Sequence, residues 1–341
     1  MNAAQDPSRI LEVGFGFWGS KVLLTAVELE VFTTLADRAM TGEELRQAMA
    51  LHPRGIWDFL DALVALGFLE REGDGATGRY RNTEASGRFL DKKQPTYVGG
   101  ILEMANARLF RFWNDLGPAL KTGQPQNEVK HSQKAMFETL YEDLPRLEQF
   151  MGAMRGISMG NFQALADKFD FSKYHTLCDV GGATGLLSTL VAKRYPHLHC
   201  ISFDLPQVEP IAKRWIAQAS LSDRVRAVSG DFLKDGLPKA DVVTMGMILH
   251  DWNLERKKHL IRLAYEALAD DGAFIAVENL IDDARRENAF GLMMSLNMLI
   301  EFGDAFDFTG KDFGGWCREA GFKRYEVLHL AGPCSAAIAY K

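Results

Sequence analysis

The sequence predicts an α/β fold, in which a mostly parallel sheet is covered by helices on both faces and follows a mostly helical N-terminal domain. After residue 171, short β-rich runs alternate with helix-length segments, a pattern typical of parallel sheets with crossover helices. Before that point, apolar residues recur mainly at helical spacing. The length of 341 residues allows two domains, which we expect at residues 1–100 and 101–341.

The amino-acid composition is typical of a soluble globular protein and gives no electrostatic drive toward nucleic acid or anionic lipid. Apolar residues make up 47% and charged residues 25%, and 39 Lys and Arg against 45 Asp and Glu give a net charge of −6. The N-terminus lacks the basic and apolar regions of a signal peptide, and about 18 consecutive apolar residues never occur without a charge. We therefore expect no nucleic-acid and no membrane partner.

The four cysteines are spread along the chain without the close spacing of a zinc site. They stand at positions 178, 200, 317 and 334. We expect no metal and no disulfide framework. The protein is predicted to be cytoplasmic, with reduced thiols.

The N-terminal domain is expected to contain one or two buried amphipathic helices between residues 10 and 35, followed by a winged helix. Thr41 and Glu44 have the spacing of a capping box at the start of a short helix, and apolar residues keep a helical period from 55 to 66. Two short β-rich runs then flank a glycine-rich tip at 73–78. Two short helices followed by a β-hairpin describe a winged helix.

A winged helix suggests DNA binding, but its second helix carries no cation. Between Gly55 and Gly67 the sequence has Asp58 and Asp61 and neither Lys nor Arg, whereas a helix in the major groove needs basic and amide side chains. We therefore interpret this domain as a dimerisation module. The apolar N-terminal helices, which include Phe15, Phe17 and Trp18, predict a homodimer.

A mostly helical connector from 97 to 169, with expected breaks at Pro118, residues 123–125 and Pro145, leads to seven β-rich runs. They span residues 176–182, 199–205, 225–232, 241–250, 273–280, 325–331 and 335–341. Helix-length segments separate the first five runs, which predicts parallel strands. Only the tripeptide GPC separates the last two, which predicts a hairpin and an antiparallel strand in the sheet.

Polar residues gather where the first three strands end, at the edge where open α/β sheets bind ligands. The first strand ends in a glycine-rich turn at 181–185. Asp204 ends the second strand 23 residues after Gly181, the separation expected of an acid that binds ribose hydroxyls. The third strand ends in Gly230, Asp231 and Phe232, an acid and a ring suited to adenine.

This arrangement fits NAD as well as S-adenosylmethionine, and two features favour the latter. The turn Gly-Gly-Ala-Thr-Gly lacks the glycine spacing of a dinucleotide fingerprint. The Gly-Asp-Phe element and the terminal hairpin have no counterpart in a dehydrogenase. We predict S-adenosylmethionine as the cofactor and S-adenosylhomocysteine as its product.

A histidine and an acid end neighbouring strands at the same edge. His250 ends the fourth expected strand, and the fifth contains Glu278 at its ligand edge. A lone histidine could simply cap the next helix, but a carboxylate at matching height fixes the tautomer and leaves the other nitrogen free to accept a proton. The pair predicts a general base, and the ordinary histidine pKa of about 6.5 predicts an acidic limb near pH 6 to 7.

These motifs resemble the small-molecule O-methyltransferases typified by the caffeic acid and acetylserotonin enzymes. The resemblance rests on the runs DVGGATG, FDLP, GDF, LHDW and VEN and covers essentially the whole chain. It implies a class I methyltransferase sheet with strand order 3-2-1-4-5-7-6 and a dimerising winged-helix domain. It also implies an S-adenosylmethionine-dependent O-methyltransferase of secondary metabolism.

The resemblance assigns roles to individual positions. His250 corresponds to the catalytic base, Glu278 to the acid that orients it, and Asp307 to a second orienting acid that is usually Glu in the family. Cofactor contacts are expected at Gly181, Asp204, Leu205, Asp231, Phe232, Met245, Met154 and Ser158, and acceptor contacts at Asp251, Met298 and Phe302. Gly246 departs from the Lys of many plant members, so a cofactor contact there is missing or made by backbone.

The predicted reaction is methylation of a hydroxyl on a small aromatic or heteroaromatic metabolite. A phenol with a pKa of about 10 can pass its proton to histidine in the transition state, whereas an aliphatic alcohol is a much harder acceptor. The aromatic and Met-rich segment 290–308 suits a flat ring. Two alternatives stay open: a C- or N-methyltransferase on the same scaffold, and a winged-helix regulator that binds S-adenosylmethionine without catalysis.

Overall fold

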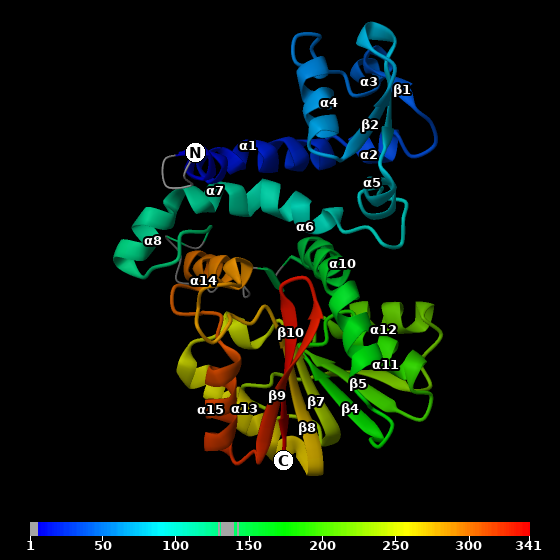
Figure 1. Ribbon diagram of the computed structural model, residues 1–341. Helices are drawn as coiled ribbons and strands as arrows, with labels where there is room; N and C mark the ends of the chain where they lie inside the picture. The colour runs from blue at the N-terminus through cyan, green and yellow to red at the C-terminus, as the bar shows by residue number, and fades with distance from the viewer. Residues whose placement is uncertain (1–5, 129, 131–139, 142) are drawn as a thin grey trace. The chain divides into compact units, whose positions relative to one another are not determined.

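The computed structural model describes residues 6–128, 130, 140–141 and 143–341, and the chain divides into two compact units, Met1–Arg111 and Phe112–Lys341 (Figure 1). The boundary expected from the sequence lies earlier, at residue 100. Helix α6 (Gly99–Met104) and the π-helical turn η3 (Ala105–Leu109) belong to the first unit. Asn106 of η3 accepts a hydrogen bond from Lys21 and donates one to Glu28, both on α1 (Ser8–Glu28).

The first unit contains the predicted winged helix. Its further elements are α2 (Val31–Thr34), β1 (Met40–Thr41), α3 (Gly42–Ala48), α4 (Ile56–Ala65), β2 (Leu69–Glu72), η2 (Gly75–Thr77), β3 (Arg79–Asn82) and α5 (Glu84–Phe89). The strands pair antiparallel in the order β1-β3-β2. The capping box forms, because Thr41 Oγ1 accepts from Glu44 N and Glu44 Oε2 accepts from Thr41 N at 2.7 Å.

Helix α1 leaves the apolar side chains of its first half exposed, so the expectation that this segment is buried is wrong for its N-terminal part. Ile10 is 75% exposed and Trp18 58%, whereas Leu24 and Val27 are buried. Over its most apolar 18 residues α1 has a mean hydropathy of 1.4, and it is the one helix of the described residues that is long and apolar enough to cross a membrane. A helix whose exposed apolar side is covered by a second protein has a similarly apolar composition.

The helical connector continues with α7 (Phe110–Phe112), η4 (Trp113–Asp115), α8 (Leu116–Thr122) and α10 (Leu144–Lys168). The break expected at residues 123–125 is confirmed, and Pro145 lies at the start of a helix, in the first turn of α10. The break expected at Pro118 is wrong, because this proline lies in the first turn of α8, which continues directly from η4. A proline fits there since the first N–H groups of a helix have no intrahelical partner.

The second unit is built on a seven-stranded sheet of order β6-β5-β4-β7-β8-β10-β9, which confirms the predicted α/β fold and its strand order. The strands are β4 (Thr176–Val180), β5 (His199–Asp204), β6 (Val225–Ser229), β7 (Ala240–Gly246), β8 (Leu268–Glu278), β9 (Arg324–Ala331) and β10 (Cys334–Tyr340). Strand β10 is antiparallel to both of its neighbours, and the other pairs are parallel.

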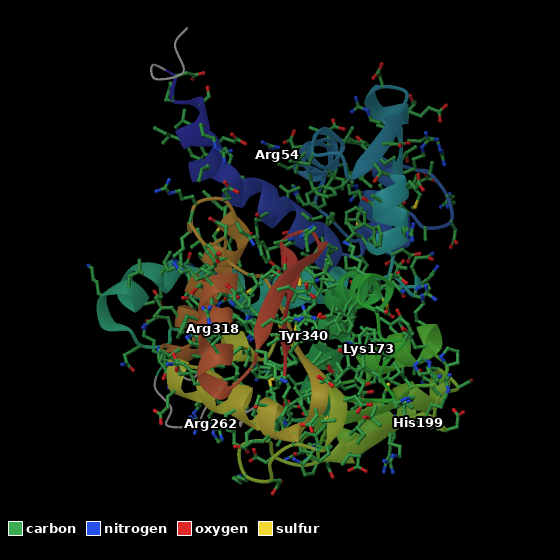
Figure 2. The ribbon with its side chains drawn as sticks, turned by 60° about the horizontal axis from the view of Figure 1, so that its bottom comes forward. Arg54, Lys173, His199, Arg262, Arg318 and Tyr340 are labelled. Atoms are coloured by element: carbon green, nitrogen blue, oxygen red, sulfur yellow. The ribbon has the colours of Figure 1, made fainter. Side chains whose placement is uncertain are left out.

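Helices cover both faces of this sheet (Figure 1). On one face α10, α11 (Leu186–Arg194) and α12 (Glu209–Gln218) pack on Leu177 and its neighbours. On the other face α13 (Leu254–Ala267) and α15 (Gly310–Ala320) pack on Cys178, the next residue of the same strand. Exposed basic side chains project from separate parts of this unit, as Figure 2 shows for Lys173, His199, Arg262 and Arg318.

Candidate active site

The first strand of the parallel sheet, β4, ends in a turn that requires glycine. Gly181 and Gly185 have φ values of +68° and +71°, which side chains other than glycine rarely adopt. A Cβ on Gly182 would lie 2.3 Å from Oγ of Ser202, and one on Gly181 would lie 2.3 Å from Cδ1 of Ile248. The absence of side chains therefore lets this turn pack directly against β5 and Ile248.

Asp204 ends β5 and ties that strand to the glycine turn. Its Oδ2 accepts a hydrogen bond from the backbone N–H of Ala183 at 2.9 Å, and its Oδ1 accepts one from Leu205 at 2.7 Å. Burial raises the pKa of Asp204 to about 6, although the two donors lower it. Each oxygen keeps a lone pair for a further donor, such as a ribose hydroxyl.

Asp231 and Phe232 follow β6 at the same edge, and both are partly exposed. Asp231 Oδ1 accepts a hydrogen bond from Leu233 N at 3.0 Å, and Oδ2 lies 2.8 Å from the ammonium of Lys234, which lowers the pKa of Asp231. The ring of Phe232 packs edge-on against Trp252, with centroids 6.1 Å apart. An acid and an aromatic face are thus available together.

The remaining positions expected at the cofactor differ in exposure. Met154 and Ser158 lie one turn apart on α10 and are partly exposed. Met245 is fully buried in the core on the α13 side of the sheet, so its side chain contacts core residues. A cofactor contact at Met245 stays a prediction, and it would have to be made by the backbone.

Gly246, at the end of β7, packs directly against an aromatic ring of α10. A Cβ on Gly246 would lie 2.7 Å from Cζ of Phe162. The ring of Phe162 occupies the space in which a side chain at position 246 would begin. A side chain larger than glycine at position 246 would therefore require Phe162 to move.

The expectation that His250 ends a strand is wrong, because His250 lies on the 3-10 turn η5 (Leu249–Asp251). Strand β7 already ends at Gly246. Oε1 of Glu278, the last residue of β8, accepts hydrogen bonds from the backbone N–H groups of residues 248, 249 and 250 at 3.2, 2.9 and 3.4 Å. This carboxylate bends the chain into the turn because it satisfies N–H groups that a longer strand would have paired.

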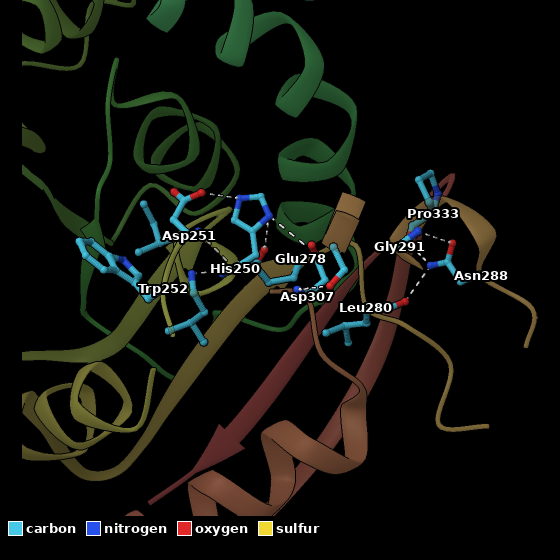
Figure 3. Close-up of polar contacts among 12 residues, drawn as sticks. His250, Asp251, Trp252, Glu278, Leu280, Asn288, Gly291, Asp307 and Pro333 are labelled. Carbon is cyan, nitrogen blue, oxygen red and sulfur yellow. Dashed lines mark hydrogen bonds and ion pairs between the residues drawn. The ribbon is translucent and has the colours of Figure 1, made fainter. Parts of the chain in front are cut away.

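Three carboxylates surround the imidazole of His250 (Figure 3). Nδ1 lies 3.6 Å from Oδ1 of Asp307 and 3.9 Å from Oε2 of Glu278, and Nε2 lies 3.3 Å from Oδ1 of Asp251. Burial lowers the pKa of His250, but the three carboxylates raise it more, to about 10. The site therefore strongly stabilises the protonated imidazole.

Several polar atoms of this cluster are buried and have no hydrogen-bond partner within the described part of the chain. They are His250 Nδ1, Glu278 Oε2 and both carboxylate oxygens of Asp307. These three residues form the one group, among the residues described, whose ligand atoms lie close enough to hold a metal ion, all within 4.8 Å. The same geometry also suits a proton on Nδ1 that lies between the carboxylates of Glu278 and Asp307, with no metal ion. The expected absence of a metal therefore stays a prediction.

Helix α14 (Ala289–Phe302) positions Asp307 and contacts the turn η5. The N–H of Asp307 donates to Ser295 Oγ of this helix at 3.1 Å. Asn288 caps α14 and donates to the carbonyls of Leu280 and Pro333 at 2.7 and 3.1 Å, which ties the helix to the end of β8 and to the terminal hairpin (Figure 3). The second acid is thereby held beside His250.

The positions expected at the acceptor lie around the same turn. Met298 and Phe302 are four residues apart on α14, so they share one face of the helix. Met298 is buried and Phe302 is partly exposed, while Asp251 follows His250 on η5. The structure thus brings the expected acceptor residues to the same edge as the base.

Tyr141 and Lys257 also lie in or near this region, although the sequence assigned neither of them a role in the site. Burial raises the pKa of Tyr141, and the negative charges of Asp204 and Asp251 raise it further. Lys257 of α13 is fully buried, donates to the carbonyl of Trp252 and lies 3.8 Å from the ring centroid of Phe306.

A sequence signal existed for Lys257 but not for Tyr141. Lys257 precedes Leu260, Ile261 and Ala264 at the spacing of the apolar face of α13, so a cation stands at a core position. Burial lowers the pKa of Lys257 to about 8. Tyr141 belongs to no periodic pattern.

Comparisons with protein families match both units of the chain. A model of the O-methyltransferase dimerisation domain matches residues 11–92. A model of the O-methyltransferase domain matches residues 113–323.

Individual relatives are similar over nearly the whole chain. The tetracenomycin polyketide synthesis 8-O-methyl transferase TcmO of Streptomyces glaucescens is 39% identical, over 99% of this chain and 97% of its own length. The N,N-dimethyltransferase OxyT of Streptomyces rimosus is 35% identical over 92% and 90%. The crystal structure of human N-acetylserotonin methyltransferase in complex with SAM superposes with a TM-score of 0.90 at 28% identity, over 100% of this chain and 99% of that one.

Proposed function

The chain belongs to the family of S-adenosylmethionine-dependent O-methyltransferases that act on small metabolites, and we propose that it methylates a hydroxyl of an aromatic or heteroaromatic acceptor with His250 as general base. The observation that carries this proposal is the imidazole of His250, whose Nδ1 faces Glu278 and Asp307. A site for binding alone has no need of a histidine oriented in this way.

The carboxyl edge of the sheet fits the cofactor. S-Adenosylmethionine supplies a methyl group on a sulfonium centre, which is already activated for transfer. The glycine turn at Gly181 brings backbone without side chains to this edge, and the lone pairs of Asp204 suit ribose hydroxyls. Asp231 and Phe232 suit the adenine amino group and ring, while the backbone of Leu205 and the side chains of Met154 and Ser158 complete the proposed contacts.

His250 accepts the proton of the acceptor hydroxyl at Nε2. Glu278 and Asp307 act on Nδ1 and hold the proton there, which leaves Nε2 as the acceptor. Asp251 lies 3.3 Å from Nε2, so its carboxylate can accept a hydrogen bond from Nε2–H once the acceptor proton has been transferred. Alignment in such a site contributes up to about 7–11 kcal/mol, and base catalysis a factor of about 10² to 10⁴ in rate.

An aromatic hydroxyl suits this base better than an aliphatic one. Burial lowers the pKa of His250, but the carboxylates raise it more, which brings it nearer to the pKa of about 10 of a phenolic hydroxyl. Proton transfer becomes easier as the two pKa values approach each other, whereas an aliphatic alcohol holds its proton much more tightly. Met298 and Phe302 on α14 offer the apolar surface that a flat ring needs.

N-methylation is the second candidate reaction, because the relative OxyT is named as an N,N-dimethyltransferase. An amine acceptor also passes a proton to a base and would use the same alignment. A SAM-binding regulator without turnover is a third outcome. An assay with labelled cofactor and a panel of aromatic acceptors separates all three.

We also propose that the protein is a cytoplasmic homodimer. The match to a dimerisation domain covers residues 11–92, and this range includes the exposed Val13, Phe15, Phe17 and Trp18 of α1. A second copy that covers these side chains would remove a large apolar patch from water. The four cysteines are free and buried, in keeping with a reducing compartment.

The test is incubation of the pure protein with labelled S-adenosylmethionine and a panel of phenols, indoles, pyrroles and aromatic amines. We expect label on an aromatic oxygen, and no label with His250→Ala in the same time. Label on nitrogen only would replace the proposed reaction with N-methylation, and label on carbon only would replace it with C-methylation. Cofactor binding without any labelled product would support the regulator, and loss of activity in a chelator would contradict the metal-free mechanism.

A further inference from the structure

A partly buried arginine of α10 lies against the glycine-rich turn. Arg155 Nη1 donates a hydrogen bond to Oγ1 of Thr184 at 3.2 Å, and its guanidinium stacks on the ring of Trp215 on α12, 4.4 Å from the ring centroid. Thr184 is 2% exposed and directly follows Ala183, whose N–H binds Asp204. Arg155 is therefore fixed at the turn that the proposed function assigns to the cofactor.

The charge of Arg155 has no carboxylate partner among the residues that the structure describes. Burial lowers the pKa of Arg155, and no acidic group of the described chain counteracts this. Arg214, also on α12, differs, because it pairs with Glu148 at 2.6 Å. A desolvated guanidinium costs free energy unless an anion faces it, and its planar donors fit a carboxylate.

The chemistry of the cofactor indicates which anion this is. S-Adenosylmethionine has one anionic group, the carboxylate of its methionine part; its adenine and ribose are neutral, and its sulfonium and ammonium groups are cations. A guanidinium at the glycine turn repels these cations unless the carboxylate lies against it.

Resting on the function proposed above, we propose that Arg155 binds the carboxylate of the cofactor's methionine part. Thr184 and Trp215 hold the guanidinium from its edge and its face, so little side-chain freedom is lost when the carboxylate binds. The remaining N–H donors of the fork are available to the ligand. Arg155 thus sets the end of the binding site at which the methionine part lies.

The test compares two ligands that differ only in this carboxylate. S-Adenosylhomocysteine and its decarboxylated form, S-adenosyl-3-thiopropylamine, are titrated calorimetrically into the full-length wild type, Arg155→Gln, Arg155→Lys and the control Arg214→Gln. We expect wild type to prefer S-adenosylhomocysteine by about tenfold to a hundredfold. Arg155→Gln should lose this preference with less than about a twofold change for the decarboxylated ligand, Arg155→Lys should regain part of it, and Arg214→Gln should keep it.

Equal weakening of both ligands by Arg155→Gln would overturn the inference, because Arg155 would then only support the turn. An unchanged affinity of Arg155→Gln for S-adenosylhomocysteine would overturn it too, since the carboxylate would then bind elsewhere. A wild type that binds neither ligand would instead overturn the proposed function, and this inference with it.

Discussion

Glu278 contacts His250 at two places: its Oε1 accepts a hydrogen bond from the backbone N–H at 3.4 Å, and its Oε2 lies 3.9 Å from Nδ1 of the imidazole. One carboxylate therefore shapes the turn that carries the base and also acts on the ring. Asp307, at 3.6 Å from Nδ1, acts on the ring alone. The two acids are not equivalent, and their variants should behave differently.

The first prediction concerns the base. His250→Ala should lower turnover by about two to four decades and leave affinity for S-adenosylhomocysteine nearly intact, because the residues proposed at the cofactor are unchanged. The measurements are steady-state kinetics and calorimetry on the same preparations. Turnover like that of the wild type would mean that alignment alone suffices.

The structure changes the pH profile that the sequence predicts. A raised pKa means that His250 stays protonated, and so unable to act as a base, up to a higher pH. The acidic limb of kcat/KM in the wild type should therefore lie well above pH 6.5, not near pH 6 to 7 as an unperturbed histidine would give.

The second prediction distinguishes the roles of Asp307 and Glu278 by the position of the acidic limb of kcat/KM and by thermal stability. Asp307→Asn removes a negative charge that raises the pKa of His250, so the acidic limb should move to lower pH with no large loss of thermal stability. Glu278→Ala should lower the melting temperature as well, because three backbone N–H groups lose their acceptor.

Asp304→Asn is the matched control, an exposed acid of the same loop that bonds Asn253. The acidic limb should stay in place in this variant. A limb that also stays in place in Asp307→Asn would show that Asp307 does not act on His250.

Much of the fold was predictable because it depends on periodicity. The alternation of strands and helices gave all seven strands of the sheet, and the short GPC segment gave the antiparallel β10. The end of β7 was not predictable, since Met247 and Ile248 look like a continued strand. The chain turns there because the carboxylate of Glu278, 28 residues after His250, accepts hydrogen bonds from the N–H groups of residues 248–250. No local sequence pattern encodes this contact.

The candidate site likewise has residues that the sequence predicts and residues that it does not. Asp204 and Asp231 stand at strand ends, which the sequence reveals, whereas Tyr141 and Arg155 reach the site from outside the sheet. Arg155 lies within a helix of mixed composition, and only the packing of α10 on the sheet shows that it meets Thr184. Side chains that reach the site from segments outside the sheet are therefore the part that the sequence did not predict.

The third prediction tests the packing at Gly246. Gly246→Ala should place a methyl group 2.7 Å from Cζ of Phe162 and destabilise the protein by about 1–3 kcal/mol, the usual cost of overpacking. The double variant with Phe162→Leu should recover part of the loss in a thermal unfolding assay. Full stability in Gly246→Ala alone would mean that α10 shifts freely at this point.

The fourth prediction concerns the ribose acid. Asp204→Ala should weaken binding of S-adenosylhomocysteine by about 1.5–3 kcal/mol, because hydrogen bonds to an ionised acceptor are lost. Asp223→Ala removes an exposed acid before β6 and serves as the control. Calorimetry that finds unchanged binding in Asp204→Ala would contradict the assignment.

The last prediction concerns the exposed face of α1. Light scattering of the wild type at micromolar concentration should report twice the chain mass of 38.1 kDa, and Trp18→Glu should shift the protein toward a monomer, because a carboxylate would have to be buried in an apolar interface. Val327→Glu, an equally unfavourable charge on an exposed apolar residue of β9, should leave the dimer intact. A wild-type monomer would contradict the prediction, and if the same protein floated with lipid vesicles, the apolar length of α1 would be explained by a membrane instead of a second copy.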